Sequence, residues 1–349
     1  MKYDDKLTGK VMELAEKLGS SLTGIADAEV LDQALEEEFR PQDVLPGCRT
    51  VVVMSLHIPD GSLEIMRRGF SSYSYNLFGY AYLNRELDFL AYRMSNFLDG
   101  EGWATIPLPA RNASIGARKK SYGMISFRHA AVAAGLASFG LSGLALTPKF
   151  GSRQRFIGLP TSAPLRPTEV LLAQKEVCDG CLECIAHCPA GALSIKPPHE
   201  VTMGKITYRY ANAIPSKCRM MASGLSTKVW PGAKFNPKVD VEYIEDPTPE
   251  QVFRQLWEQR DPRLRVLEHS EATFGATNCG RCMAFCTAGH QAMKNRLNPQ
   301  EKTRGYCDDM VLGPKGDLTA LRPRPRKAGL ELLGISQAEA EKGNAKSNP

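Results

Sequence analysis

The chain has 349 residues, of which 43% are hydrophobic and 23% are charged, and its formal net charge is +6. This is the composition of an ordinary soluble globular protein, and the length predicts two domains. The excess of 44 Lys and Arg over 38 Asp and Glu is small and scattered, so it leaves tRNA binding open without arguing for it. Because the first residues contain no apolar signal region and no twin arginine, we expect a cytoplasmic protein.

Hydrophobic patterning predicts an N-terminal region in which helices alternate with strands. The expected helices have apolar side chains at helical spacing or are acidic, and they cover residues 6–19, 31–39, 83–98 and 127–137. The expected strands are short apolar runs at residues 24–26, 50–56, 105–108 and 144–147. Such an alternation predicts an α+β fold with an α/β-like N-terminal domain.

One uncharged segment, residues 130–148, approaches the length of a membrane-spanning helix. It is built from Ala, Gly and Ser and is interrupted by three glycines. We therefore predict a buried helix, a glycine turn and a strand, and no membrane span.

Residues 178–189 read C-x2-C-x2-C-x3-C-P, the run with which bacterial-type ferredoxins hold iron–sulfur clusters. Three closely spaced thiolates can surround one cluster, and the fourth Cys, followed by Pro, normally ligates a second cluster. One motif of this kind therefore implies two clusters and requires further cysteines elsewhere.

Those cysteines are present. Residues 279–286 read C-x2-C-x3-C, and a lone Cys218 lies between the two motifs. Cys218 is the best candidate for the eighth thiolate, and Cys307 is the replacement candidate. Cys48 precedes an apolar run and is predicted to be a small buried side chain.

Crossed ligation, as in ferredoxins, predicts two four-iron sites. One site takes Cys178, Cys181, Cys184 and Cys286. The other takes Cys188, Cys218, Cys279 and Cys282. Zinc ribbons have two C-x2-C pairs and need neither the third Cys nor the Cys-Pro, and disulfides are a poor fit for a large chain without a secretory signal.

Composition also predicts the domain boundaries. A proline-rich stretch separates an N-terminal domain, residues 1–165, from a ferredoxin-like domain, residues 166–310. The second domain carries a long insert at residues 219–278, with an expected helix at residues 249–260. Residues 311–349 are charged and rich in Ala, and they are expected to form a flexible tail.

The block upstream of the first motif resembles the family that joins epoxyqueuosine reductases to reductive dehalogenases. Both have an AGLG…G…G…L…P…GS…R…T…PL block before the cysteine run and a lone cysteine before the second motif. Here the block occupies residues 128–136, 140–148, 150–153 and 161–165. The resemblance covers roughly residues 5–290.

This resemblance implies a cobalamin held base-off between the two domains. Electrons from a ferredoxin or flavodoxin would reach it through the two 4Fe-4S clusters and would reduce an electrophile, either an organohalide or the epoxide of a tRNA nucleoside. Glycines allow the backbone to approach a flat macrocycle closely, and arginines can pair with its phosphate or amides. The candidates are Gly135, Gly140, Gly143, Gly151, Arg153 and Arg155. The alternative is that the glycines pack a helix and close turns, and that the arginines are surface charges.

The chain departs from the family pattern at the proton donor. Epoxyqueuosine reductases have an Asp in a stretch that here contains Tyr122 instead, beside Lys119 and Lys120. Reductive dehalogenases resemble this arrangement better, because a basic neighbour lowers the pKa of a phenol and makes it a better donor. Tyr122 can also be an ordinary half-buried aromatic. The second motif ends in Cys286-Thr287 rather than Cys-Pro.

Four tyrosines, Tyr73, Tyr75, Tyr80 and Tyr82, could roof a substrate pocket or belong to the core. Two hypotheses follow from the sequence. The first is a corrinoid-dependent iron–sulfur reductase. The alternative is a cobalamin-free electron-transfer or reductive-activator protein that has kept the clusters and lost the substrate site.

Overall fold

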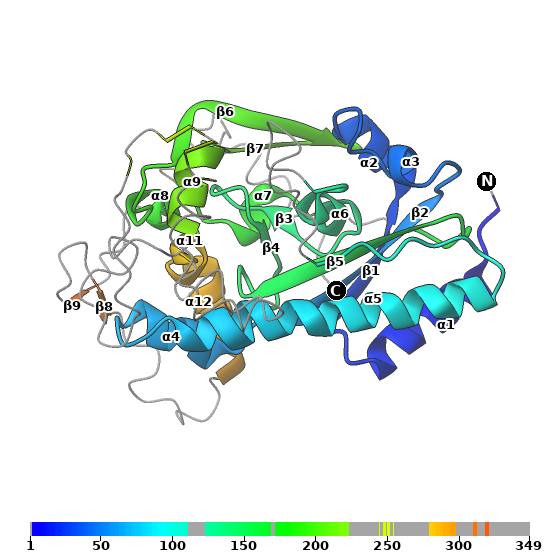
Figure 1. Ribbon diagram of the computed structural model, residues 1–349, viewed down its shortest axis with the longest axis horizontal. Coiled ribbons are helices and arrows are strands. Elements are labelled where there is room, and N and C mark those ends of the chain that lie inside the picture. Colours follow the sequence, from blue (N-terminus) through cyan, green and yellow to red (C-terminus); the bar gives the residue numbers. More distant parts are fainter. Residues whose placement is uncertain are drawn as a thin grey trace, which may run out of the picture.

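The computed structural model is a mixed α+β fold (Figure 1). An antiparallel sheet in the order β1-β2-β5 forms the centre of the N-terminal region. Its strands are β1 (Leu22–Asp27), β2 (Thr50–His57) and β5 (Gln154–Thr161). The structure describes residues 2–110, 123–168, 172–222, 244, 247–248, 250–251, 254, 279–297, 310–312 and 318–320.

Both faces of this sheet are buried. Val51 and Val53 of β2 point into one core cluster, whereas Val52 and Met54 point into another. Successive side chains of a strand point to opposite faces, so a strand covered on both sides reads as one continuous apolar run. The expectation of a fully buried strand at residues 50–56 is confirmed.

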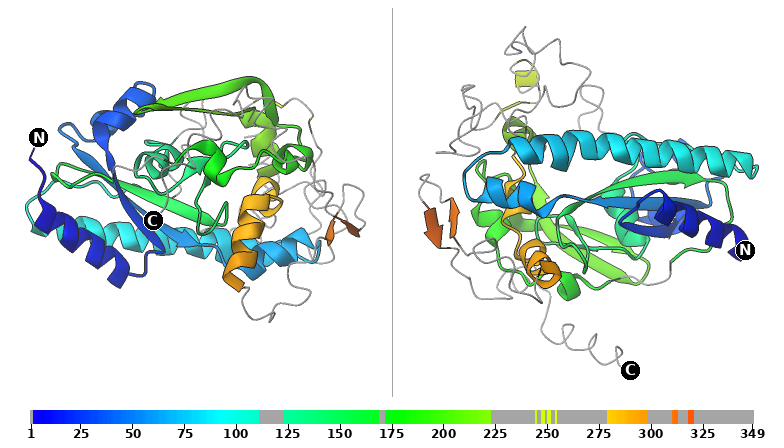
Figure 2. Two further views of the ribbon diagram at one scale, coloured as in Figure 1. Left: turned by 180° about the vertical axis from the view of Figure 1, so that it is seen from behind. Right: turned by 90° about the horizontal axis from the view of Figure 1, so that it is seen from below.

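Helices cover the sheet on both faces. Helices α1 and α5 contribute to the core cluster of one face, and α6 contributes to that of the other (Figures 1 and 2). The helical elements of this region are α1 (Asp5–Lys17), α2 (Ala28–Ala34), α3 (Pro41–Val44), α4 (Asp60–Arg67), the π-helix η1 (Tyr75–Ala81), α5 (Tyr82–Gly100) and α6 (Phe127–Ala133).

Several sequence predictions differ from the structure, including two helix ends: the helix predicted to end at residue 39 ends at Ala34, and the one predicted to end at residue 137 ends at Ala133. The second helix begins at Ala28 rather than residue 31, because the Asp27 carboxylate caps it by accepting from the Glu29 N–H at 2.8 Å. The strand expected at residues 105–108 is reduced to one bridge between Thr105 and Thr161. Strand β5 was not predicted.

The uncharged segment 130–148 forms the end of α6 and a short hairpin, so the predicted helix and the predicted strand at residues 144–147 are confirmed, and the first strand of the hairpin was not predicted. Its strands are β3 (Ser138–Phe139) and β4 (Ala145–Leu146). Within the described part of the chain, no helix combines the length and the apolar character needed to cross a membrane.

The cysteine-rich region is built from short helices and one long hairpin. The hairpin brings Val201, Met203, Tyr208 and Tyr210 into the same core cluster as Phe139, so the two regions share a core. The elements are α7 (Gln174–Val177), α8 (Glu183–Ala186), β6 (Leu193–Met203), β7 (Ile206–Ala213), α9 (Pro215–Ala222), α11 (Arg281–Ala284) and α12 (Thr287–Leu297).

Strands β8 (Met310–Leu312) and β9 (Leu318–Ala320) form an antiparallel pair at the start of the segment expected to be a tail. Most of the expected helix at residues 249–260 lies outside the described residues.

Candidate metal centres

The two cysteine motifs share a local turn. Leu182, with a φ of 64°, precedes α8, and Gly280, with a φ of 56°, precedes α11. The left-handed conformation suits glycine and costs other residues about 1–2 kcal/mol. Each motif then places its last cysteine, Cys188 or Cys286, just after the short helix. The two motifs therefore present their thiols in similar local geometry.

Four thiols drawn from both motifs lie close enough to affect one another's ionisation. Burial raises the pKa of Cys178 to about 12, and the charge of Cys286 adds to this. Burial also raises the pKa of Cys181, to about 11, and raises the pKa of Cys184 well above its usual value, again with a contribution from Cys286. We call Cys178, Cys181, Cys184 and Cys286 the first thiol group.

The first thiol group lines a hollow between the cysteine-rich region and the N-terminal region. The hollow contains about 310 Å³ of empty space, including space open to solvent. The β3–β4 hairpin closes one side with Leu141 and Leu146, and the start of α12 contributes Thr287. Apolar side chains therefore shield one side of the four thiols, and polar groups lie on another.

Four further thiols form a second thiol group, Cys188, Cys218, Cys279 and Cys282. Burial raises the pKa of Cys279 to about 12, and the charges of Cys218 and Cys188 add to this. Burial raises the pKa of Cys282 as well, with contributions from Cys279, Cys218 and Cys188. The two groups adjoin, because the charge of Cys282 also raises the pKa of Cys184.

Two members of the second thiol group, Cys188 and Cys279, pack against a core cluster that the two regions share. In this cluster, Met66 and Tyr75 come from the N-terminal region, and Met283 and Phe285 lie within the second motif, between Cys282 and Cys286. Cys282 packs against the cluster that contains Cys178 and Cys184 of the first group. A Cβ added at Gly280 would lie 2.8 Å from the ring of Tyr75. This close approach requires glycine between Cys279 and Cys282. Cys218, which lies on α9, is the exposed member of the group.

Backbone N–H groups point at the sulfur atoms. The Leu141 N–H donates to Cys178 Sγ at 3.4 Å, and the Ala192 N–H donates to Cys188 Sγ at 3.2 Å. Among the residues that the structure describes, no three His, Cys, Asp or Glu side chains are arranged to hold a metal ion. The thiolates of a four-iron cluster each bind a different iron, so they stand further apart than the ligands of one ion.

Arg281 places a buried positive charge beside the second thiol group. Its Nε donates to the His187 carbonyl at 3.0 Å, and its guanidinium lies 5.1 Å from the centre of the Phe285 ring. Burial lowers the pKa of Arg281, and the charges of Cys279 and Cys188 oppose that change. An arginine keeps its charge in proteins, so this cation is permanent.

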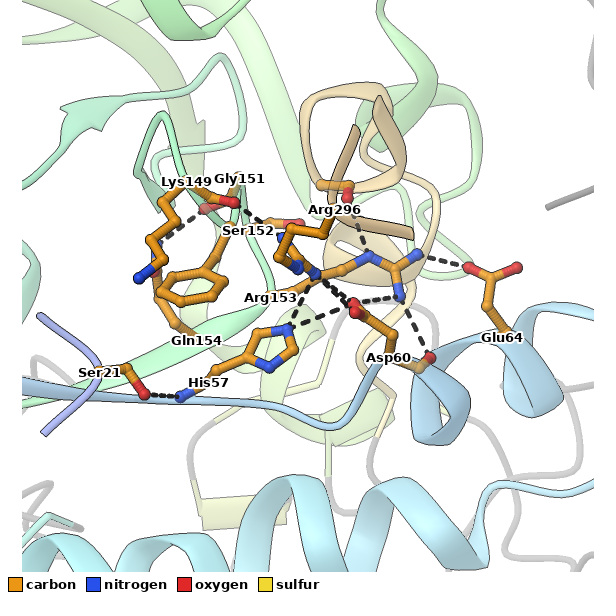
Figure 3. A network of polar contacts seen from close by, with 12 residues as sticks. Ser21, His57, Asp60, Glu64, Lys149, Gly151, Ser152, Arg153, Gln154 and Arg296 are labelled. Carbon is orange, nitrogen blue, oxygen red and sulfur yellow. Dashed lines mark hydrogen bonds and ion pairs between the residues drawn. The ribbon is translucent and has the colours of Figure 1, made fainter. Parts of the chain in front are cut away.

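A buried ion network joins α4 to the helix that follows Cys286 (Figure 3). Arg153 is fully buried, and its Nη2 donates to Glu64 Oε1 at 2.5 Å. Its Nε donates to the Gly289 carbonyl of α12 at 3.1 Å. Arg67 donates to the other carboxylate oxygen of Glu64 at 2.9 Å. One buried carboxylate therefore balances two buried guanidinium groups.

The outer end of α12 is attached to the N-terminal region as well. Arg296 Nη2 donates to both carboxylate oxygens of Asp60 at 2.6 Å, and its Nη1 donates to the Lys149 carbonyl at 2.7 Å (Figure 3). Burial acts to raise the pKa of Asp60, but the hydrogen bonds from His57 and Arg296 outweigh it, so that pKa is lowered. The helix after Cys286 is therefore held at both ends.

The glycines predicted to approach a cofactor lie against protein atoms. A Cβ added at Gly140 would lie 2.6 Å from Leu146, and one added at Gly143, which has a φ of 75°, would lie 2.9 Å from Tyr210. Gly135, with a φ of 69°, follows the end of α6. Close turns and packing account for these positions, and their role toward a cofactor stays a prediction.

Gly151 and the two predicted arginines have protein partners too. A Cβ at Gly151, which has a φ of 59°, would lie 2.3 Å from the Gly289 nitrogen. Arg153 belongs to the buried ion network rather than to the surface. The Nε of Arg155 donates to Asn84 Oδ1 at 2.6 Å.

The predicted proton donor Tyr122, its neighbours Lys119 and Lys120, and Cys307 lie outside the described residues. Cys48 is buried, as predicted.

The four tyrosines do not share one environment. Tyr75 is buried and the Tyr80 ring lies 4.2 Å from the Arg155 guanidinium, whereas Tyr73 and Tyr82 are exposed. They do not form a common roof.

The sequence did not indicate that Asp179 lies beside the first thiol group or Arg281 beside the second. It also did not indicate that Glu64 is linked to α12 through Arg153. Arg281 carried a signal, since it lies inside the second motif. The unusual Thr287 after the last cysteine was noticed, but its partners were not.

No protein-family model and no curated protein matches this sequence. Among solved structures, the fold is similar across most of the chain to two classes of reductase, the reductive dehalogenases and the epoxyqueuosine reductases.

The particular structures have low identity to this chain. Catabolic reductive dehalogenase NpRdhA matches at 17% identity and a TM-score of 0.47, over 93% of this chain and 41% of its own. An epoxyqueuosine reductase with an epoxyqueuosine-modified tRNA stem loop matches at 18% identity and a TM-score of 0.44, over 89% of this chain and 91% of its own. Epoxyqueuosine reductase from Bacillus subtilis matches at 19% identity and a TM-score of 0.44, over 98% of this chain and 96% of its own. This chain thus spans about two fifths of the length of the dehalogenase.

Proposed function

We propose that this chain is an iron–sulfur oxidoreductase that holds one four-iron cluster on each thiol group. The main support is geometric: Cys178, Cys181 and Cys184 of the first motif line one hollow together with Cys286 of the second motif. The charge of Cys286 also raises the pKa of all three. Ferredoxin-type ligation crosses in this way. Two independent C-x2-C zinc sites have no need to cross. Residues 166–310 would then form a ferredoxin-like two-cluster domain.

The surroundings of the thiols suit such clusters. Soft thiolates are the ligands that iron–sulfur clusters prefer, and N–H donors stabilise the negative charge on the sulfurs. Leu141 and Ala192 supply such donors, one to each group. Because burial raises the pKa of these thiols, the cysteines must release protons when the metal binds.

The placement of the two groups supports a path for electrons. When bound, the clusters supply one-electron transfer. The groups adjoin, and the second packs against Met66 and Tyr75 of the N-terminal region. We propose that a ferredoxin or flavodoxin supplies the electrons and that they leave toward the N-terminal region.

The finer proposal is a reductase that uses base-off cobalamin on an electrophilic small molecule or a tRNA nucleoside. Tyr122, beside Lys119 and Lys120, would donate the proton. Protein atoms occupy the space beside Gly140, Gly143 and Gly151, so these three glycines give no direct support for a corrin site. Cobalamin therefore enters the proposal through the sequence resemblance alone.

The packing of these glycines against protein atoms favours a second candidate function. A chain whose glycines pack against its own atoms, and whose Arg153 is enclosed in an ion network, can be a two-cluster electron carrier or reductive activator without cobalamin.

The iron content tests the common part of both candidates. After anaerobic reconstitution with iron and sulfide, we expect about eight irons per chain. Cys218→Ala should lose about half of them, and Cys48→Ala, a buried cysteine outside both groups, should lose none. A full iron content in the Cys218→Ala variant would exclude Cys218 as a ligand and would point to Cys307.

Retention of hydroxocobalamin separates the two candidates. Cobalt bound one to one, with a base-off absorption spectrum, would support the corrinoid reductase. Full iron with no cobalt retained after gel filtration would support the carrier.

A further inference from the structure

The residue after the last cysteine differs between the two motifs. Pro189 follows Cys188, whereas Thr287 follows Cys286 and begins α12. The hydroxyl of Thr287 lies 3.2 Å from Cys181 Sγ in the first thiol group. Proline has no hydroxyl, so the ferredoxin-type Cys-Pro ending lacks this contact. The substitution therefore places a polar hydrogen beside a sulfur that we propose binds iron.

The same hydroxyl has a second partner. Thr287 Oγ1 lies 3.2 and 3.3 Å from the two carboxylate oxygens of Asp179. The Cys181 N–H also donates to Asp179 Oδ1, at 3.2 Å, which fixes the carboxylate beside the sulfur. All three residues line or adjoin the same hollow. The structure thus builds a triangle of hydroxyl, carboxylate and sulfur.

The triangle has one proton and two acceptors. An ionised carboxylate and a thiolate can only accept, and a threonine hydroxyl has one hydrogen to donate. When the cluster takes up one electron its negative charge increases, and an O–H···S bond then becomes more favourable. Hydrogen bonds to sulfur and nearby charge are among the factors that set the potential of a cluster. The hydroxyl and the carboxylate act in opposite directions.

We propose that Thr287 and Asp179 together set the reduction potential of the cluster on the first thiol group. Thr287 raises the potential by donating to Cys181 Sγ. Asp179 lowers it through its negative charge and by competing for the hydroxyl hydrogen. This inference rests on the proposed function, because it requires a cluster on that group.

The experiment is an anaerobic redox titration of the reconstituted full-length protein with dithionite, followed by electron paramagnetic resonance. The two clusters titrate as two one-electron steps. Thr287→Val removes the hydroxyl and should lower the potential of one step, and Thr287→Ser should restore it. Asp179→Asn should raise the potential of the same step. Thr207→Val, an exposed threonine on the β6–β7 hairpin, should shift neither.

A double variant tests the competition for the hydrogen. With Asp179→Asn present, the hydroxyl is freer to donate to sulfur, so Thr287→Val should then lower the potential by more than it does in the natural chain.

Three outcomes would count against these statements. A natural protein that binds no iron would overturn the proposed function and this inference with it. Full iron, with Thr287→Val and Asp179→Asn both leaving each step unchanged, would overturn this inference alone. Shifts in two different steps would also overturn it. Asp179→Asn is measured independently, so the inference stays testable even if Thr287→Val fails to fold.

Discussion

The two thiol groups share a local turn but are supported in different ways. The first lies beside a hollow, and its Cys286 precedes a helix that the N-terminal region holds through Arg153 and Arg296. In the second, Cys188 and Cys279 pack against apolar side chains from both regions, and Cys218 is exposed. The first site therefore has ion pairs and close backbone contacts in addition to apolar packing, whereas the second relies on apolar packing from both regions. Disturbing the ion network should therefore affect the first site more than the second.

The largest expected effect is that of Glu64→Ala. It removes the carboxylate that pairs with the buried guanidinium groups of Arg67 and Arg153, and the Asp60 carboxylate stays 3.7 Å from Arg153. Breaking a buried ion pair in this way costs about 3–5 kcal/mol. We expect that loss in urea denaturation followed by circular dichroism, together with a lower iron content at the first site.

The matched control is Glu13→Ala. Glu13 pairs with Lys17 at the surface of α1, where such a pair contributes about 0.3–0.5 kcal/mol. Equal losses from the two variants would contradict the role assigned to the buried network.

Gly151→Ala should have the next largest effect. The added methyl would meet the Gly289 backbone at 2.3 Å, and the φ of 59° disfavours alanine. Overpacking costs about 1–3 kcal/mol, and the left-handed conformation adds about 1 kcal/mol. Because Gly289 also donates to the Cys286 thiol, the first cluster should bind more weakly.

Gly19→Ala isolates the conformational part of that cost. Gly19 has a φ of 88° and no atom within 4 Å of an added Cβ, so only the backbone strain remains. The account would be wrong if Gly19→Ala cost as much as Gly151→Ala or also weakened iron binding.

The smallest expected effect is on the pH dependence of stability, through His129, and it should not distinguish the two sites. Burial lowers the pKa of His129 to about 3, below its value of about 6.5 in the unfolded chain. The unfolded chain therefore binds an extra proton between pH 6.5 and 3, and stability falls as the pH falls through this range. The loss is about 1.4 kcal/mol per pH unit.

His129→Gln should remove that part of the pH dependence. Urea midpoints at pH 7.5 and 5.5 measure it, and the natural protein should lose more stability than the variant. Identical pH dependence in both proteins would show that the imidazole is not held neutral.

The sequence predicted those parts of the fold that rest on local patterns. Strand β2 was predictable because burial on both faces gives an unbroken apolar run. Strand β5 was not predictable, because Gly158 and Pro160 interrupt its run of apolar residues. The assignment of eight cysteines followed from spacing alone and stays a prediction.

The supports of the candidate sites could not be predicted because they join distant positions. Glu64 and Arg153 are 89 residues apart, and Thr287 lies 108 residues from Asp179. No local pattern relates such residues. The sequence therefore marked Thr287 as unusual without indicating what it contacts.

The most direct test of the central claim is the iron content of a double variant, Cys178→Ala with Cys286→Ala. If both cysteines hold the same cluster, the double variant should lose about half of the iron, no more than either single variant loses. Loss of all the iron from the double variant, with each single variant losing half, would mean that the motifs do not cross and would contradict the account.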